Sequence, residues 1–256
     1  MTAADCFSGH AASYVRFRPV YPAGVFDFLS QVAPARRCAW DAGTGNGQAA
    51  GELAACFDRV VATDISATQL CQAKPHPRVE HRVASAEESG IEDGALNLVT
   101  AFQAAHWFDL QRFFAEVKRV LAPRGVCAIL CYGRCRINDD VDDIVDRFYS
   151  QTVGPYWPPQ RRLVETGYRT VDFPFGKLQT PSFQIQCEWD LGAFVSYLRT
   201  WSATQRFIKD RHVDPLIEFM PLLENAWGRD VGLSDVTWPL HARVGRLLSP
   251  AKIALR

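Results

Sequence analysis

The sequence predicts an α/β fold built on a mostly parallel sheet with helices on both faces, and three observations carry this prediction. Short apolar runs alternate with segments of helical periodicity between residues 37 and 132. One run ends in Asp41 and passes directly into a glycine-rich turn, and another ends in Asp64. Strand alternating with helix is typical of parallel βαβ units with right-handed crossovers. A chain of 256 residues is long enough to bury one large core of this kind.

The regular elements fall in the first half of the chain. Tyr21 and Pro22 are expected to open a helix that ends before Pro34, because apolar residues recur there at helical spacing. Ser66 can cap a later helix through its side-chain oxygen. Strands are expected at residues 37–41, 59–65, 79–83, 96–102 and 126–132, and further helices at 48–56, after Ser66, and at 110–121.

The pattern weakens after Gly133. We expect helices at 137–152 and 191–208, a half-buried strand at 183–190 because apolar and polar residues alternate there, and a final strand pair at 236–238 and 242–248. The whole chain, 1–256, is therefore expected to form one domain. Its parts are an N-terminal helical cap at 1–35, a ligand-binding core at 36–133, and a lid or insertion with the final strands at 134–256.

Composition argues against several classes of function. The 28 basic and 28 acidic side chains cancel, so the basic excess typical of a nucleic-acid-binding protein is missing and no nucleic-acid partner is expected. No apolar run reaches the length of about eighteen residues that a membrane span needs. The first ten residues lack the pattern of a secretory signal. Eight cysteines, several in apolar segments, are expected to be buried thiols of a cytoplasmic protein, and no cysteine or histidine spacing indicates a metal site.

The glycine turn is the strongest functional motif. Asp41 is followed by Gly43, Gly45 and Gly47, and a predicted helix begins at once. Glycines permit a tight turn and a close approach of the backbone to a ligand, and the helix N-terminus adds unsatisfied N–H groups. The turn suits either a dinucleotide or the methionine part of S-adenosylmethionine. The third glycine comes one residue earlier than in the dehydrogenase pattern, and an acidic residue is unfavourable beside a pyrophosphate but not beside an ammonium and a sulfonium group. The spacing therefore favours S-adenosylmethionine.

Asp64 is the second candidate binding residue. A carboxylate at the end of the second strand can accept hydrogen bonds from both ribose hydroxyls of an adenosine. The alternative is a helix-capping role beside Ser66, and we favour the ligand role.

These motifs resemble those of the class I S-adenosylmethionine-dependent methyltransferases. The glycine turn with Asp41 resembles the family's first motif, Asp64 its ribose-binding acid, and residues 84–87 its adenine-binding segment. Residues 14–22 and 103–109 resemble the trans-aconitate methyltransferase-like branch (methyltransferase type 11). Since Ser85 stands where many relatives carry an acid, Ala86 and Glu87 are expected to take the adenine contacts.

The resemblance implies a Rossmann-like fold with a seven-stranded sheet, S-adenosylmethionine as cofactor and S-adenosylhomocysteine as product. It also implies methyl transfer to a small molecule, for which we expect the oxygen of a carboxylate or hydroxyl group as acceptor. The cofactor-binding residues expected are Tyr14, Arg18, Asp41, Gly43, Thr44, Gly45, Gly47, Asp64, Ile65, Ala86, Glu87 and Gln103.

His106 is the candidate catalytic base. It follows the fourth strand, at the edge where open α/β sheets bind ligands. The alternative is a hydrogen-bonded loop histidine packed against Trp107. A hydroxyl or amine acceptor needs a base, whereas a carboxylate is already a nucleophile. Aromatic side chains can wall a pocket and attract a sulfonium, and core packing is the alternative for each. The substrate-pocket candidates are Tyr21, Trp107, Trp157 and Trp201.

Two other classes of function stay open. A nicotinamide-dependent oxidoreductase also places a glycine turn after the first strand, although the glycine spacing in this chain argues against it. A protein that binds the cofactor without catalysis is the second alternative, because methyl transfer has no obligatory catalytic residue that a sequence would reveal.

Overall fold

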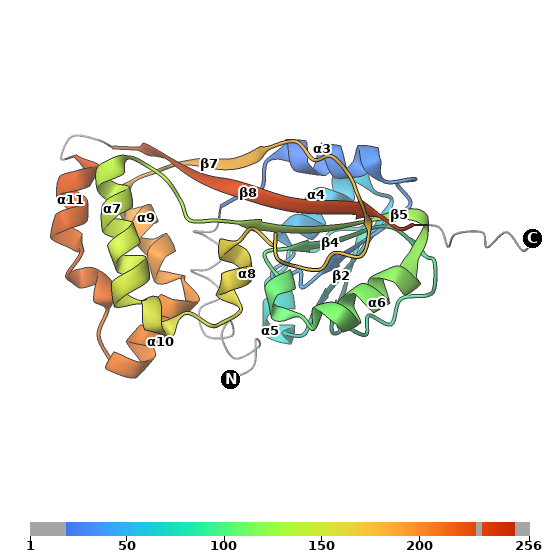
Figure 1. Ribbon diagram of the computed structural model, residues 1–256, viewed down its shortest axis with the longest axis horizontal. Helices are drawn as coiled ribbons and strands as arrows, with labels where there is room; N and C mark the ends of the chain where they lie inside the picture. The colour runs from blue at the N-terminus through green and yellow to red at the C-terminus, as the bar shows by residue number, and fades with distance from the viewer. Residues whose placement is uncertain (1–18, 229–231, 249–256) are drawn as a thin grey trace, which may run out of the picture.

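The computed structural model describes residues 19–228 and 232–248. Two residues expected to contact the cofactor, Tyr14 and Arg18, lie outside this part of the chain. The described residues form one twisted sheet with helices on both faces, and a group of helices lies beyond one end of the sheet (Figure 1). The α/β architecture predicted from the sequence is confirmed.

The sheet has the strand order β3-β2-β1-β4-β5-β8-β6, and β7 also pairs with β8. Neighbouring strands from β3 to β5 are parallel, whereas β6, β7 and β5 each run antiparallel to β8. The eighth strand, beyond the seven expected, is the two-residue β6. The strands are β1 (Cys38–Ala42), β2 (Arg59–Asp64), β3 (Val79–Val83), β4 (Leu96–Phe102), β5 (Leu121–Tyr132), β6 (Gly176–Lys177), β7 (Phe183–Trp189) and β8 (Ser234–Arg246).

The order of the strands creates a crevice. The chain leaves β1 toward β2 on one side and later returns to β4 on the other side of β1. The segments that follow β1 and β4 therefore diverge, and a space opens at the carboxyl ends of these two strands. In open α/β sheets this position is where ligands bind.

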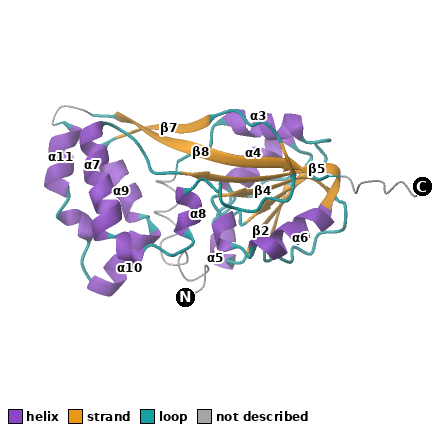
Figure 2. Ribbon diagram, viewed as in Figure 1, coloured by secondary structure: helices purple, strands orange, loops and turns teal. Residues whose placement is uncertain are grey.

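Helices cover both faces of the sheet (Figure 2). Buried Leu29 of α3 and Leu53 of α4 pack in the core on one face, and Phe113 and Val117 of α6 pack in the core on the other. The helices are α3 (Ala23–Val32), α4 (Gln48–Cys56), α5 (Ala67–Leu70), α6 (Leu110–Val120), α7 (Asp139–Arg147), α8 (Arg161–Glu165), α9 (Leu191–Arg199), α10 (Ser202–Arg211) and α11 (Met220–Trp227).

Strand β5 contributes side chains to the apolar cores on both faces of the sheet. Val126, Ala128 and Leu130 belong to one core, and the alternating residues belong to the other. Cys127 and Cys131 are among the latter, as strand alternation predicts. Burial raises the pKa of the Cys131 thiol to about 12, so both cysteines act as small apolar core residues.

The expected helix at 191–208 is wrong as a single element. The chain forms α9, breaks at Thr200 and Trp201, and resumes as α10. Trp201 has extended backbone angles (φ −62°, ψ 134°) and is buried among aromatic rings. Packing of this one side chain therefore overrides the helical periodicity on both sides of it.

The expected final strand pair is also wrong, because residues 234–246 form one continuous strand, β8. Pro239, which lacks an N–H group, lies between the two predicted strands. Its carbonyl accepts the Gly133 N–H at 3.0 Å, just past the last residue of β5 that pairs with β8. An N–H group at position 239 would point to the same side as this carbonyl, toward β5. The pairing of β5 with β8 has already ended there, so the missing N–H breaks no hydrogen bond of the ladder and the strand continues through the proline.

Candidate functional site

The glycine turn after β1 needs backbone conformations that other residues rarely adopt. Gly43, Gly45 and Gly47 have φ values of 66°, 57° and 79°. A Cβ atom on Gly43 would lie 2.7 Å from the Cβ of Ala104 and 2.9 Å from a ring carbon of Phe108. The turn after β1 and the segment after β4 therefore approach each other so closely that only glycine fits at position 43.

Asp41 lies under this turn and is 1% exposed. Its two carboxylate oxygens accept hydrogen bonds from the hydroxyls of Thr44 at 2.6 Å and Thr100 at 2.9 Å. Burial raises the pKa of Asp41 to about 6, the two hydroxyls act in the opposite direction, and the negative charge of Asp64 raises it further. A cation in the adjacent cleft would offset the cost of this buried charge.

Asp64 closes β2 and holds the glycine turn. Its Oδ2 accepts the Gly45 N–H at 2.9 Å, and its Oδ1 accepts the Ser66 N–H at 2.8 Å. Each carboxylate oxygen has a second lone pair, so the residue can still accept hydrogen bonds from a diol. Ser66 itself caps α5 by accepting the Gln69 N–H, as predicted. The capping role thus belongs to Ser66, and the ligand role of Asp64 stays a prediction.

A cleft opens over the turn at the carboxyl ends of β1, β2 and β4. Its empty volume, counted to its open mouth, is about 1120 Å³. Most of the described residues predicted to bind the cofactor line this cleft. They are Asp41, Gly43, Thr44, Gly45, Asp64, Ile65, Ala86, Glu87 and Gln103, and Tyr21 and Trp107 line it as well.

Gly47 is the described cofactor candidate that the structure does not bring to the lining of the cleft. It precedes α4 in a left-handed conformation, and a Cβ there would meet His81 and Ala73 at 3.0 and 3.1 Å. Its position serves the close packing of the turn against the segments around β3.

A second pocket adjoins the cleft, and we call it the aromatic pocket. Its empty volume is about 550 Å³. It shares Gln103, Trp107 and Tyr132 with the cleft, so the two spaces adjoin at these residues. The remaining lining residues are His106, Trp157, Pro158, Arg161, Tyr197, Trp201 and Ser202. Trp107, Trp157 and Trp201 thus line one pocket, whereas Tyr21 lines the cleft, and their contact with a substrate stays a prediction.

His106 lies in a short 3₁₀ turn, Ala105–Trp107, after β4. Its Nδ1 is 3.0 Å from the hydroxyl oxygen of Tyr168, and its ring centroid is 5.1 Å from that of Trp107. Tyr168 is completely buried, and burial raises its pKa well above the usual value, so its hydroxyl stays protonated. The imidazole is therefore held in one orientation by a neutral hydroxyl group.

Gln103 carries backbone strain at the junction of the two spaces. Its φ is 54°, which is uncommon for a residue with a side chain. Its Oε1 accepts the Tyr132 N–H at 2.8 Å, and its own N–H donates to Leu130 at 2.8 Å. These bonds to β5 fix the turn that carries His106 and Trp107 away from β4.

Four residues of this site were not predicted from the sequence. Thr100 lies within the fully buried strand β4, and Tyr132 is the last residue of β5. Tyr168 and Arg161 come from a segment without a regular pattern. Only the contacts of the folded chain bring them to the cleft, to His106 and to the aromatic pocket.

Comparison with known proteins gives the family of the chain. Residues 40–129 match the family model described as a methyltransferase domain. A protein from Dictyostelium discoideum named as a methyltransferase is 31% identical over 244 residues, which is 93% of each chain. The chain belongs to the methyltransferase family. A solved structure described as a type II methyltransferase from Anaeromyxobacter dehalogenans is 45% identical, covers 91% of this chain and 100% of its own, and superposes with a TM-score of 0.85.

The cofactor of this methyltransferase is S-adenosylmethionine, as its family implies. The residues present fit this molecule: a glycine turn without space for a side chain, a buried carboxylate at Asp41, and a positioned carboxylate at Asp64. The matched segment, 40–129, includes the glycine turn and Asp64 but ends before Trp157, Arg161 and Trp201. The methyltransferase has no helix among its described residues that is long and apolar enough to cross a membrane.

Proposed function

We propose that this methyltransferase transfers a methyl group to an oxygen atom of a small molecule that binds in the aromatic pocket. The observation that carries the proposal is the junction at Gln103, Trp107 and Tyr132, where this pocket meets the cofactor cleft. An acceptor in the pocket would lie directly beside a methyl donor in the cleft. The balanced charge of the chain supports a small molecule rather than a nucleic acid as acceptor.

The residues of the cleft then divide the work of binding. Asp64 accepts hydrogen bonds from the ribose, Gly43 and Gly45 let the backbone approach the amino-acid part, and the carboxylate of Asp41 offsets positive charge nearby. Ile65, Ala86 and Glu87 line the same cleft, and we assign the adenine to them. When bound, S-adenosylmethionine supplies an electrophilic methyl group, and the protein supplies position and electrostatics.

His106 is the proposed catalytic residue. Nδ1 faces the Tyr168 hydroxyl, and we assign the reaction with the acceptor to Nε2. If Nδ1 donates its hydrogen to the Tyr168 oxygen, Nε2 carries a lone pair and can take the proton of an acceptor hydroxyl. A carboxylate acceptor would not need this step, so dependence of the rate on His106 distinguishes the two acceptor classes.

Titration calorimetry followed by a turnover assay tests the proposal. We expect saturable binding of S-adenosylmethionine and S-adenosylhomocysteine but not of NADH. We also expect transfer of a radiolabelled methyl group to a small acid or alcohol in a metabolite mixture. Binding of NADH in place of the other two ligands would contradict the cofactor assignment. Binding without transfer to any small molecule would instead favour a protein that holds the cofactor and does not catalyse.

A further inference from the structure

Arg161 differs from two other arginines near the aromatic pocket because it has no ion-pair partner among the residues that the structure describes. Arg134 is paired with Asp146, and Arg199 binds Asp214 at 2.7 Å. Within residues 19–228 and 232–248, no carboxylate oxygen lies within 4.0 Å of an Arg161 side-chain nitrogen. A guanidinium group at the wall of a pocket without an anion beside it is a candidate binding site for an anionic ligand.

The Arg161 side chain is nevertheless held in place. Its Nε donates to the Tyr149 hydroxyl at 3.0 Å, and that hydroxyl donates to Glu165 Oε1 at 2.5 Å. The guanidinium also lies over the Trp157 ring, 4.7 Å from its centroid. Burial is the main cause that raises the pKa of Tyr149 to about 12, so the bridging group is neutral. The hydrogen bond from Nε thus orients the Arg161 guanidinium. Glu165 interacts with this charge only through the Tyr149 hydroxyl.

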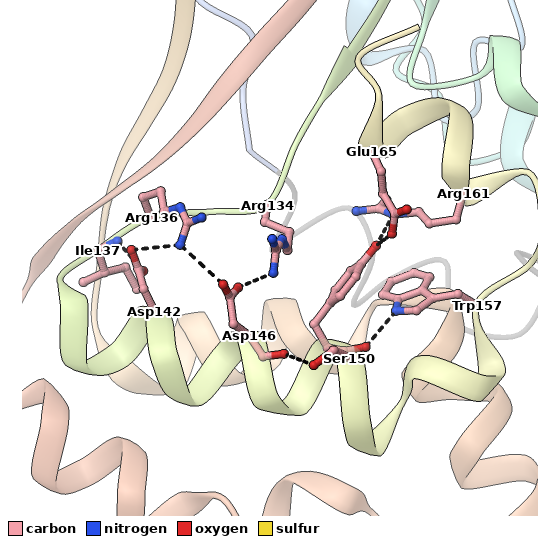
Figure 3. A network of polar contacts seen from close by, with 10 residues as sticks. Arg134, Arg136, Ile137, Asp142, Asp146, Ser150, Trp157, Arg161 and Glu165 are labelled. Carbon is pink, nitrogen blue, oxygen red and sulfur yellow. Dashed lines mark hydrogen bonds and ion pairs between the residues drawn. The ribbon is translucent and has the colours of Figure 1, made fainter. Parts of the chain in front are cut away.

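The chain builds this support with an irregular helix end. Helix α7 continues into a π-helical turn, Phe148–Thr152, which carries Tyr149. The Tyr149 carbonyl accepts the Trp157 indole N–H at 3.2 Å. Figure 3 shows Trp157, Arg161 and Glu165 gathered at this end of α7, beside the Arg134–Asp146 pair. π-Helical turns are frequent at functional sites.

The position of Arg161 gives the orientation of the ligand. Gln103, Trp107 and Tyr132 form the side of the aromatic pocket that adjoins the cofactor cleft, whereas Arg161 lines the aromatic pocket and not the cleft. An anionic group held by Arg161 is therefore directed away from the methyl donor, and a second group of the same molecule must receive the methyl. Trp157 and Trp201 also line the aromatic pocket, and their rings pack against each other with centroids 5.6 Å apart. Such walls suit a flat ring.

From these contacts we infer that the acceptor is a hydroxylated aromatic carboxylic acid, with its carboxylate on Arg161 and its phenolic oxygen at the junction with the cleft. This inference rests on the proposed function. In the reaction the phenolic oxygen forms a bond to the methyl carbon as the bond from that carbon to the sulfonium breaks. The phenolic proton passes to His106, and the products are an aryl methyl ether and the neutral thioether. Among the described residues that line the pocket, Arg161 alone carries a guanidinium, so a second carboxylate would find no cationic partner among them.

The first test measures binding to the complex with S-adenosylhomocysteine by calorimetry. The probes are 4-hydroxybenzoate and its neutral analogue 4-hydroxybenzamide. We expect the acid to bind the wild-type protein about tenfold or more tightly than the amide, as a charge-assisted contact implies. This comparison needs no variant. Equal affinities, or no binding of the acid to a complex that has bound S-adenosylhomocysteine normally, would overturn the inference while leaving methyltransferase function intact. Failure to bind S-adenosylhomocysteine would instead count against the proposed function.

Two variants in α8 locate the effect. Arg161→Gln is expected to abolish the preference for the acid, whereas Arg162→Gln, at an exposed position of the same helix, is expected to keep it. Normal affinity of both variants for S-adenosylhomocysteine shows that they are folded. Equal loss of the preference in the two variants would overturn the role of Arg161.

Product analysis tests the orientation. With radiolabelled S-adenosylmethionine and the three positional isomers of hydroxybenzoate, at least one isomer is expected to yield a base-stable methyl ether. A base-labile methyl ester, or no ether from any isomer, would overturn this orientation of the acceptor. Tighter binding of the aliphatic tricarboxylate trans-aconitate than of every hydroxybenzoate would overturn the acceptor class.

Discussion

The carboxylate of Asp64 accepts the backbone N–H of Gly45 at 2.9 Å, so the end of β2 holds the glycine turn that follows β1. The same carboxylate accepts the Ser66 N–H at 2.8 Å. Two donors from opposite sides thus fix its plane before any ligand arrives. This preorganisation reduces the ordering that binding would otherwise require.

Replacement of Asp64 by alanine should weaken S-adenosylmethionine binding by about 10- to 100-fold, because two hydrogen bonds to a charged acceptor and the support of Gly45 are lost together. Calorimetric titration measures the change. Asp58→Ala is the matched control, since Asp58 is an exposed acid immediately before β2. A similar loss in both variants would mean that general charge, rather than the position of Asp64, controls affinity.

Two glycine substitutions should have opposite effects on stability. Gly43→Ala forces a left-handed residue against Ala104 and Phe108, and we expect it to lower the free energy of unfolding by about 2 kcal/mol or more. Gly51→Ala lies in α4 with no atom within 4 Å of the new Cβ, and it should raise stability by up to about 1 kcal/mol. Denaturant unfolding compares them. A stabilising Gly43→Ala would show that the turn can relax.

Cofactor affinity should fall in acid as Asp41 becomes protonated. Its pKa in the free protein is about 6, raised mainly by burial, so a proton replaces the negative charge below that pH. We expect the affinity for S-adenosylmethionine to fall by up to about tenfold per pH unit below pH 6. Calorimetry at about pH 5 and pH 7 measures the fall, and Asp41→Asn should remove most of this dependence.

The raised pKa of Asp41 has the opposite effect on the stability of the free protein, which it increases in acid. Because the folded state binds this proton more tightly than the unfolded chain, the contribution of Asp41 is fully present below pH 3.8 and is lost as the pH rises through about 6. Saturating S-adenosylmethionine should therefore raise the melting temperature more at neutral pH than at pH 5. An equal increase at both values would contradict the interaction of Asp41 with a cation.

Tyr168→Phe should lower kcat about tenfold while the affinity for S-adenosylmethionine stays the same, since the hydroxyl acts through His106. The acidic limb of the pH–rate profile should also shift, because the partner of Nδ1 has changed. Tyr156→Phe removes a hydroxyl that binds exposed Asp210 at 2.7 Å and serves as the control. An unchanged profile with reduced stability would assign Tyr168 a purely structural role.

The cofactor half of the site could be predicted from the sequence because its residues are close together along the chain. Asp41 to Gly47 and Asp64 follow two strands whose parallel pairing puts their ends side by side. The aromatic pocket could not be predicted in this way. Arg161 and Tyr168 come from a segment whose spacing follows no helix or strand period, and long-range contacts alone bring them to the pocket and to His106. The single strand β8 was not predicted either, and the change of pairing partner along it is a tertiary feature.

The long strand β8 is paired with β7 along its first half and with β5 along its second half. A chain that stopped before Ser234 would leave both neighbours with a row of unpaired N–H and C=O groups, and the β5 row would lie beside residues that are almost wholly apolar. Exposed edges of this kind recruit other strands. During synthesis the sheet therefore closes only after β8 has emerged, and products truncated before Ser234 are expected to aggregate rather than to persist as a smaller enzyme.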